Sequence, residues 1–163
     1  LGKCDLTQFG STQYAKIILK QLWGMPPALD MDYEKRVEAA AREIAVARLA
    51  GSAHDVSDGG LAVALAECCF GPNGIGAVID LDSDLRPEFL LFHEGPSRIV
   101  ISTALPEQVA RIARKHNIQA PVIGATMKGG LKIRWRGKAL VDWDLRSLRT
   151  AWEGALEKAL QQG

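Results

Sequence analysis

Two short segments combine charged side chains with glycine in a way that suits the binding of an anion. The first is the run His54–Leu61, in which two acidic residues and a glycine pair precede an apolar helical stretch. Backbone N–H groups at a helix start attract anions, and glycine lets a phosphate approach the main chain closely. Asp58 or Ser57 could cap this helix, and Asp55 could orient a hydroxyl or a metal-bound water. Two carboxylates beside a phosphate would need Mg²⁺ or a basic residue nearby.

The second segment, Phe92–Arg98, lies immediately before a stretch rich in β-branched residues that is typical of a strand. Polar side chains on a turn at a strand end are well placed to hold a ligand. Arg98 could bind a phosphate or a carboxylate through two parallel hydrogen bonds. Glu94 could accept a hydrogen bond from a ribose hydroxyl or pair with an arginine.

Each segment also has a purely structural interpretation. In the first, Asp58 is a helix N-cap and the glycines form a tight packing turn. In the second, Glu94 and Arg98 form an ion pair that locks their turn. The residues alone leave both interpretations open.

Other motifs with a known chemistry are missing from the sequence. The histidines at 54, 93 and 116 and the cysteines at 4, 68 and 69 do not have a metal-ligand spacing. The sequence contains no glycine-rich phosphate loop with its lysine, no nucleophile elbow and no paired zinc-binding histidines. From this spacing we predict no zinc site in this chain.

Residue periodicity predicts elements in the order αα, α, β, β, α, β, β, β, α. The predicted helices run from Ser11 to near Gly24, from Asp32 to Gly51, over 61–66, from Pro106 to near Asn117, and from Asp144 along the stripe Leu145, Leu148, Trp152, Leu156 and Leu160. The predicted strands cover 76–81, 98–103, 121–126, 131–135 and 139–142, with hairpin turns at Gly129–Gly130 and Gly137. The third helix, apolar all round, should be buried on every side. This order predicts an α/β (α+β) fold, with a mixed, largely antiparallel sheet covered by helices.

Composition predicts a soluble, cytoplasmic protein. The chain has 163 residues, 47% of them hydrophobic, so we expect one domain over 1–163, with 1–9 as an inter-domain linker. The 20 basic and 19 acidic residues are interleaved, which implies neither a nucleic-acid nor a membrane partner. Three cysteines, two of them adjacent, fit reduced thiols better than disulfides. No apolar run is long enough to span a bilayer, and no signal peptide is recognisable.

Residues 52–67, Ser-Ala-His-Asp-Val-Ser-Asp-Gly-Gly-Leu-Ala-Val-Ala-Leu-Ala-Glu, closely resemble the signature of the last domain in the large subunit of phosphoribosylformylglycinamidine synthases. The resemblance extends over 10–14, 26–30, 122–124 and 148–156, and so over essentially the whole chain. It implies the fold of the C-terminal domain of the aminoimidazole ribonucleotide synthetase superfamily, whose members pair such a domain with an ATP-binding domain. The start without methionine suggests a piece of a longer protein.

The resemblance also implies a reaction. Formylglycinamide ribonucleotide, ATP and glutamine give formylglycinamidine ribonucleotide, ADP, phosphate and glutamate in purine biosynthesis, with Mg²⁺ neutralising phosphate charge. The implied partners are the remaining domains of the same enzyme, a glutaminase subunit and a small accessory subunit. The ending at Gln162 and Gly163, with no glutaminase segment, favours a parent that works with separate partners over one fused chain. The resemblance also implies that the catalytic histidine and the Mg²⁺ ligands belong to other domains, so we predict no catalytic residue and no metal ligand in this chain. We expect the chain alone to be inactive, because phosphoryl transfer needs the ATP-binding domain.

The large synthase looks like a tandem duplication of this two-domain pair, and this chain resembles the second copy of the C-terminal domain. Pseudo-symmetry between the two copies implies that the second one faces an auxiliary nucleotide site. The residues that we predict to line it are Asp55, Ser57, Asp58, Gly59, Gly60, Glu94, Ser97 and Arg98. The family's second motif is closer to Phe-Ser-Glu-Ser-Pro-Ser-Arg, so His93 and Gly95 replace two serines here and remove two hydroxyls. Two alternatives remain: a sibling enzyme, such as aminoimidazole ribonucleotide synthetase or selenophosphate synthetase, and a non-catalytic structural module with an auxiliary nucleotide site.

Overall fold

The computed structural model describes residues 1–22 and 24–161. The chain divides into two compact units, one of Leu1–Ala64 with Asp84–Val122 (unit 1) and one of Leu65–Ser83 with Ile123–Gly163 (unit 2). Both contain helices and strands, and the larger sheet is mixed with mostly antiparallel pairs, which confirms the predicted fold class. The prediction of one domain over 1–163 stays a prediction, and Gln162 and Gly163 lie outside the described residues.

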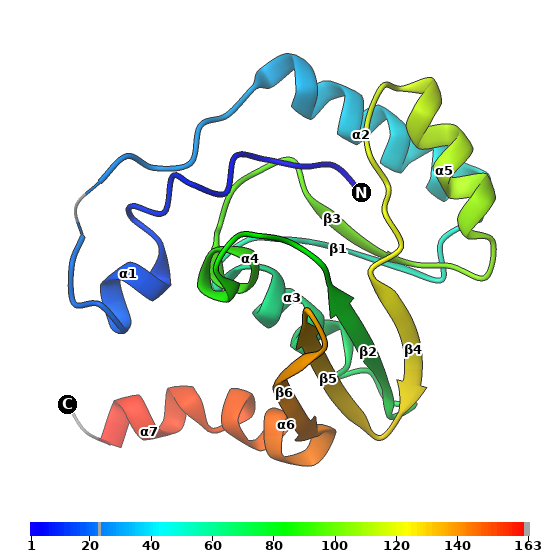
Figure 1. Cartoon of the computed structure of the whole chain (residues 1–163). Coiled ribbons are helices and arrows are strands. Elements are labelled where there is room, and N and C mark those ends of the chain that lie inside the picture. The colour runs from blue at the N-terminus through cyan, green and yellow to red at the C-terminus, as the bar shows by residue number, and fades with distance from the viewer. Residues whose placement is uncertain (23, 162–163) are drawn as a thin grey trace. The chain divides into compact units, whose positions relative to one another are not determined.

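Unit 1 is built around a two-stranded antiparallel sheet. Its strands are β1 (Ser52–Asp55) and β3 (Ile99–Ser102), and its helices are α1 (Gln13–Ile17), α2 (Met31–Val46), α4 (Pro87–Phe92) and α5 (Pro106–Lys115). Helices α2 and α5 lie side by side (Figure 1) and enclose a core of Val37, Ala40, Ala113 and Ile118. Strand β1 falls in a mixed stretch to which sequence patterning assigned no element.

The N-terminal residues of the predicted linker 1–9 are attached to unit 1. The Ile99 N–H donates to the Leu1 carbonyl at 2.9 Å, and the Gly2 N–H donates to the Gln119 carbonyl at 2.8 Å. A Cβ on Gly2 would lie 1.9 Å from the Ser97 carbonyl oxygen, so only glycine fits this crossing. The assignment of 1–9 as an inter-domain linker stays a prediction.

Two helix starts differ from their predicted positions. Thr12 caps α1 in place of Ser11, because its buried hydroxyl accepts the Ala15 N–H at 3.1 Å, whereas Ser11 has a positive φ of 63°. Asp30 caps α2 in place of Asp32 and accepts two N–H groups of the first turn. The prediction that the first helix continues to Gly24 was also wrong, since α1 ends at Ile17.

Unit 2 contains a four-stranded sheet in the order β4-β2-β5-β6. The strands are β2 (Ile75–Leu81), β4 (Gly124–Lys128), β5 (Gly130–Trp135) and β6 (Lys138–Asp144), and the helices are α6 (Leu145–Glu153) and α7 (Ala155–Gln161). Strands β2 and β5 are parallel and the other pairs are antiparallel. Ile79, Leu131 and Ile133 are buried in this unit.

Only one of the two predicted hairpins forms. Arg136 and Gly137 both have positive φ, as a two-residue turn between β5 and β6 requires, so this hairpin is confirmed. The hairpin at Gly129–Gly130 was wrong, because β2 lies between β4 and β5 and pairs with both. The nearly continuous apolar run of β2 suits a central strand, which has neighbours on both edges.

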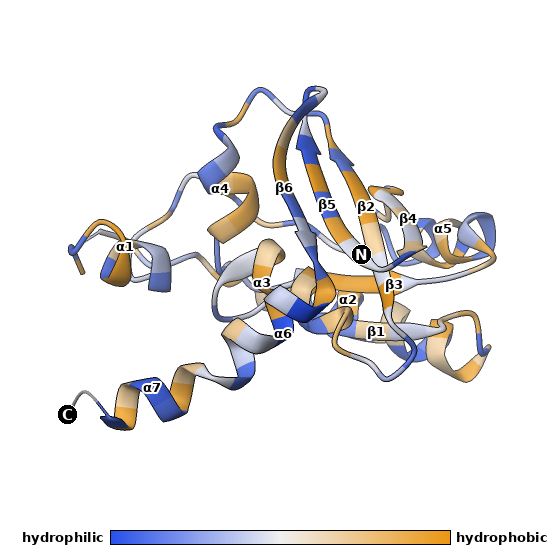
Figure 2. Cartoon of the chain, turned by 90° about the horizontal axis from the view of Figure 1, so that it is seen from below, coloured by the Kyte–Doolittle hydropathy of each residue, from blue (hydrophilic) through white to orange (hydrophobic). Residues whose placement is uncertain are grey.

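The remaining helices also differ from prediction. Helix α3 (Gly60–Cys68) begins in unit 1 and ends in unit 2, and most of its side chains are half-buried rather than buried all round. Asp144 caps α6 as predicted, but α6 ends at Glu153 with Gly154 as its C-cap, and α7 follows. The predicted stripe is not core, because Trp152, Leu156 and Leu160 are 55%, 71% and 75% exposed; Figure 2 shows apolar positions along α7.

Candidate functional site

The two segments predicted to bind an anion meet in unit 1. Strands β1 and β3 run antiparallel with Asp55 opposite Ile99, so the end of β1 lies beside the start of β3. One residue further along, the Val56 N–H donates to the Arg98 carbonyl at 2.9 Å. The glycine turn after β1 and the turn before β3 therefore form one structure, although some 40 residues separate them in the sequence.

The glycine turn is held by close backbone packing. Gly59 and Gly60 have φ angles of 79° and 70°, a region that residues with a Cβ rarely adopt. A Cβ on Gly60 would lie 2.7 Å from the Leu91 carbonyl oxygen and 2.8 Å from that of His93. Packing alone thus explains Gly60.

The carboxylate of Glu94 binds the backbone amide at the glycine turn. Its Oε1 atom accepts hydrogen bonds from the Gly59 N–H at 2.7 Å and from the Gln13 N–H at 2.9 Å. The alternative of a Glu94–Arg98 ion pair was wrong: among the described residues, Arg98 donates to backbone carbonyls, whereas Glu94 accepts backbone amides.

The Arg98 guanidinium closes its own turn. Nε donates to the Gly95 carbonyl at 3.2 Å, and Nη2 donates to the His93 carbonyl. Burial lowers the pKa of Arg98. These two bonds use part of the five N–H donors of the guanidinium and anchor the side chain to its own turn.

Ser97 is similarly engaged inside unit 1. It is 7% exposed, has a φ of 63°, and donates its hydroxyl to Glu34 of α2. A ligand contact through this hydroxyl would require the Glu34 hydrogen bond to be exchanged. Its role in binding a nucleotide stays a prediction.

The open side chains of the predicted site are Asp55, Ser57 and Asp58. All three residues are exposed, and the Asp55 side chain is 75% exposed. His54 accompanies them, with its Nδ1 atom 2.6 Å from the Asp55 carbonyl oxygen. The exposed surface of the turn is consequently acidic and hydroxylic, while its arginine faces inward.

His93 and Gly95, which replace the family's serines, are sterically coupled. His93 is fully buried, and its Nδ1 atom accepts the Gly95 N–H at 2.9 Å. Burial, and then the charge of Arg98, lower the pKa of His93. A Cβ on Gly95 would lie 2.5 Å from both His93 Cε1 and Cys4 Sγ, so the imidazole ring occupies the space of a side chain at 95.

Sequence patterning missed three residues that this site uses: Cys4, Gln13 and Glu34. Cys4 Sγ lies 3.7 Å from His93 Nδ1, and burial raises the pKa of the Cys4 thiol. All three are distant in sequence from the two motifs, so no local pattern could identify them.

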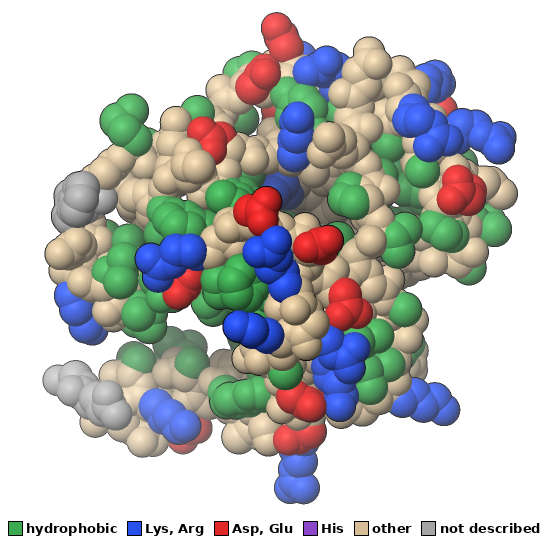
Figure 3. Space-filling view, in the orientation of Figure 1, with side chains coloured by type: hydrophobic (Ala, Val, Ile, Leu, Met, Phe, Trp, Pro, Cys, Tyr) green, Lys and Arg blue, Asp and Glu red, His purple; other side chains and the backbone are tan. Residues whose placement is uncertain are grey.

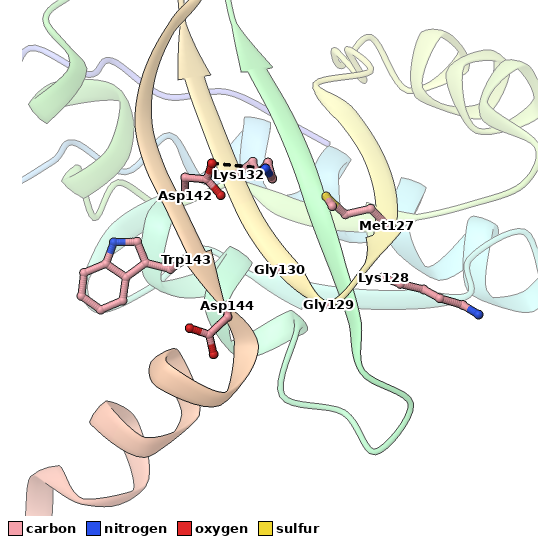
Figure 4. A pocket seen from close by; sticks show the side chains of 8 residues that line it. All are labelled: Met127, Lys128, Gly129, Gly130, Lys132, Asp142, Trp143 and Asp144. Carbon is pink, nitrogen blue, oxygen red and sulfur yellow. Dashed lines mark hydrogen bonds and ion pairs between the residues drawn. The ribbon is translucent and has the colours of Figure 1, made fainter.

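Two open depressions lie elsewhere. One, of about 230 Å³ in unit 2, is lined by β4–β6 residues, including Lys132 and Asp142, whose charged atoms are 3.2 Å apart (Figure 4). The other, of about 370 Å³ in unit 1, includes Phe9, Leu19, Met25 and Phe89 in its lining. Neither is lined by a predicted site residue.

The charged side chains of the candidate site do not by themselves form a binding site for a metal ion or a large anion. No group of three or more His, Cys, Asp or Glu residues is arranged for a metal ion in the described part of the chain. Acidic and basic side chains are interspersed on the face shown in Figure 3. Asp55 and Asp58 could serve a Mg²⁺-bound phosphate only with further ligands and positive charge from outside this chain.

Among residues 1–22 and 24–161, no helix is long and apolar enough to cross a membrane.

Comparison with known proteins identifies the family of this chain. Residues 10–136 match the family described as AIR synthase related protein, C-terminal domain. The chain belongs to this family. Phosphoribosylformylglycinamidine synthase subunit PurL of Moorella thermoacetica is 41% identical over 152 residues, which are 91% of this chain and 20% of that protein. The same subunit of Synechocystis sp. is 35% identical over 168 residues, 99% of this chain and 22% of that protein.

Solved structures show the same fold. The structure described as Thermotoga maritima PurL complexed with ATP has a TM-score of 0.69 and 22% identity, over 90% of this chain and 24% of that one. T. maritima PurL complexed with FGAR has a TM-score of 0.64 and 24% identity, over 71% of this chain and 20% of that one. This chain spans about a fifth of the length of the curated relatives described above.

Proposed function

We propose that this chain is the C-terminal part of a phosphoribosylformylglycinamidine synthase, an ATP-dependent carbon–nitrogen ligase of purine biosynthesis with glutamine as amido donor. The observation that carries the proposal is the 41% identity to the M. thermoacetica subunit over 91% of this chain. The complete enzyme uses ATP with Mg²⁺, is cytoplasmic, and works with a glutaminase subunit and a small accessory subunit. A structural neighbour described as PurLQS supports the idea of an assembly.

Within that enzyme, the chain contributes one wall of an auxiliary nucleotide site. The wall comprises the residues predicted above: Asp55, Ser57, Asp58, Gly59, Gly60, Glu94, Ser97 and Arg98. The exposure of Asp55, Ser57 and Asp58 supports direct contact with a ligand by these three. Because two donors of Arg98 are directed at carbonyls, further cations that neutralise the phosphates come from other parts of the protein.

The second candidate function of this chain is that of a non-catalytic structural module. It is favoured by the internal use of the groups that would otherwise hold an anion, namely the Gly59 N–H, Arg98 and the Ser97 hydroxyl. In that case, a ligand bound nearby would stabilise the enzyme without taking part in turnover.

Turnover of the full-length enzyme tests the reaction. We expect ADP release that depends on formylglycinamide ribonucleotide and ammonia, and its absence would refute the proposed activity. The 163-residue chain alone should form no amidine product, because it spans only about a fifth of the length of its relatives. Detectable product from this chain would contradict the assignment of phosphoryl transfer to another part of the enzyme.

Asp58→Ala in the full-length enzyme separates the two candidates, with Glu38→Ala on the exposed face of α2 as the control. Asp58 is exposed, so its loss should leave the melting temperature unchanged. Reduced turnover then indicates a direct role, and unchanged turnover indicates a structural one. Arg98→Ala should lower the melting temperature in either case, because it removes about 2 kcal/mol of hydrogen bonding within its turn.

A further inference from the structure

Glu94 joins three segments that are far apart in the sequence. It lies on the turn between α4 and β3, with its side chain half-buried. Its Oε1 atom accepts the Gly59 N–H, 35 residues away, and the Gln13 N–H, 81 residues away. One carboxylate oxygen thus connects the start of α1, the glycine turn and its own turn.

The two amides that Glu94 satisfies cannot be satisfied by their own helices. Gln13 is the first residue of α1, so its N–H has no acceptor within that helix. The Gly59 N–H lies just before α3, where the same limitation holds. A charged acceptor strengthens both bonds, and removing it leaves two donors without a protein partner.

From these contacts we infer that Glu94 is a positioning residue, which acts through the glycine turn and does not contact the ligand. The inference deepens the proposed nucleotide site and rests on that proposal. Gly60 packs against the backbone of Leu91 and His93, and Glu94, the next residue of the same segment, binds the Gly59 amide. Together these contacts hold the backbone of the turn that carries the exposed Asp58.

Amide hydrogen exchange in the full-length protein measures the positioning step directly. In Glu94→Ala, exchange at the Gly59 and Gln13 amides should rise about tenfold, which corresponds to the loss of about 1.4 kcal/mol per hydrogen bond. Glu94→Gln keeps an acceptor oxygen and should retain most of the protection. Glu38→Ala removes an exposed charge elsewhere in unit 1 and should match the wild type.

Titration with ADP and Mg²⁺ measures the consequence for binding. We expect Glu94→Ala to weaken binding about tenfold and Glu94→Gln to stay within about threefold of the wild type. Asp58→Asn should weaken binding without any change in exchange at Gly59.

The outcomes separate this inference from the proposed function. Equal losses of affinity in Glu94→Gln and Glu94→Ala, with both amides still protected, would show direct ligand contact and overturn the positioning role. Unchanged exchange in Glu94→Ala would overturn it as well. If the wild type binds no nucleotide, the proposed site fails, while the exchange data still decide whether Glu94 holds the turn.

Discussion

A serine at position 95 should be tolerated only when His93 is removed. Gly95 does not have a positive φ, so the backbone accepts serine, but the new Cβ would lie 2.5 Å from His93 Cε1 and Cys4 Sγ and 2.8 Å from His93 Nδ1. Such overlap with a fully buried ring costs about 1–3 kcal/mol, because the core must shift to relieve it. We therefore expect Gly95→Ser to lower the free energy of unfolding by about 2 kcal/mol.

The double variant His93→Ser/Gly95→Ser tests the steric origin of this cost. His93→Ser alone leaves a cavity and removes the acceptor of the Gly95 N–H, at a cost of about 2–4 kcal/mol. In the double variant the overlap with the ring is gone and only the overlap with Cys4 Sγ is left, which that side chain can relieve by turning into the space of the lost ring. The two single costs should therefore sum to about 1–2 kcal/mol more than the measured loss.

Urea unfolding of the 163-residue chain, followed by far-ultraviolet circular dichroism, gives these free energies. Gly71→Ser is the matched control, because a Cβ on Gly71 has no neighbouring atom within 4 Å. If Gly95→Ser destabilises the wild type and the His93→Ser background equally, or neither of them, the steric coupling is refuted.

Three further predictions concern stability. The pKa of His93 is lowered from 6.5 in the folded protein, so its neutral form contributes stability above about pH 6.5, and this stability is lost as the pH falls through the lower folded pKa. Urea titrations should show a free energy of unfolding that is lower at pH 5 than at pH 7, with a smaller difference in His93→Asn. Equal differences in the two proteins would contradict this. Gly60→Ala should lower the melting temperature more than Gly129→Ala, because both glycines have positive φ but only Gly60 meets backbone atoms within 3 Å; a reversed order would refute the packing argument. Leu160 is exposed, so Leu160→Glu should change the free energy of unfolding by less than about 0.5 kcal/mol. Ile133 is buried, so Ile133→Ala should lower the same free energy by about 2–5 kcal/mol. A large loss of stability in Leu160→Glu would mean that α7 is packed against the rest of the protein.

The fold was predictable where signals are local. Pro106 at the first turn of α5 and the Asp144 cap of α6 each act within a few residues, and both were identified. The apolar stripe ending at Leu160 has the period of a buried helix, yet it is exposed, because periodicity shows that a face is apolar and not what covers it.

The candidate site was predictable as two segments but not as one arrangement. Residue types identified Asp58 and Glu94 as polar groups on turns beside regular elements. They could not show that Glu94 contacts the Gly59 and Gln13 amides while Arg98 turns toward carbonyls. A carboxylate and a guanidinium four residues apart suit an ion pair equally well, and only the position of other donors and acceptors distinguishes the two arrangements.

Residues 52–67 identify the family without any coordinates, and the elements whose caps and turns lie within a few residues of one another follow from local residue types. The tertiary structure alone decided that β2 separates β4 from β5, that His93 occupies the space beside Gly95, and that Glu94 fills the amide site of the glycine turn. The physical reason is range: these arrangements depend on which distant groups satisfy a buried donor or fill a buried volume, and such partners leave no pattern among neighbouring residues.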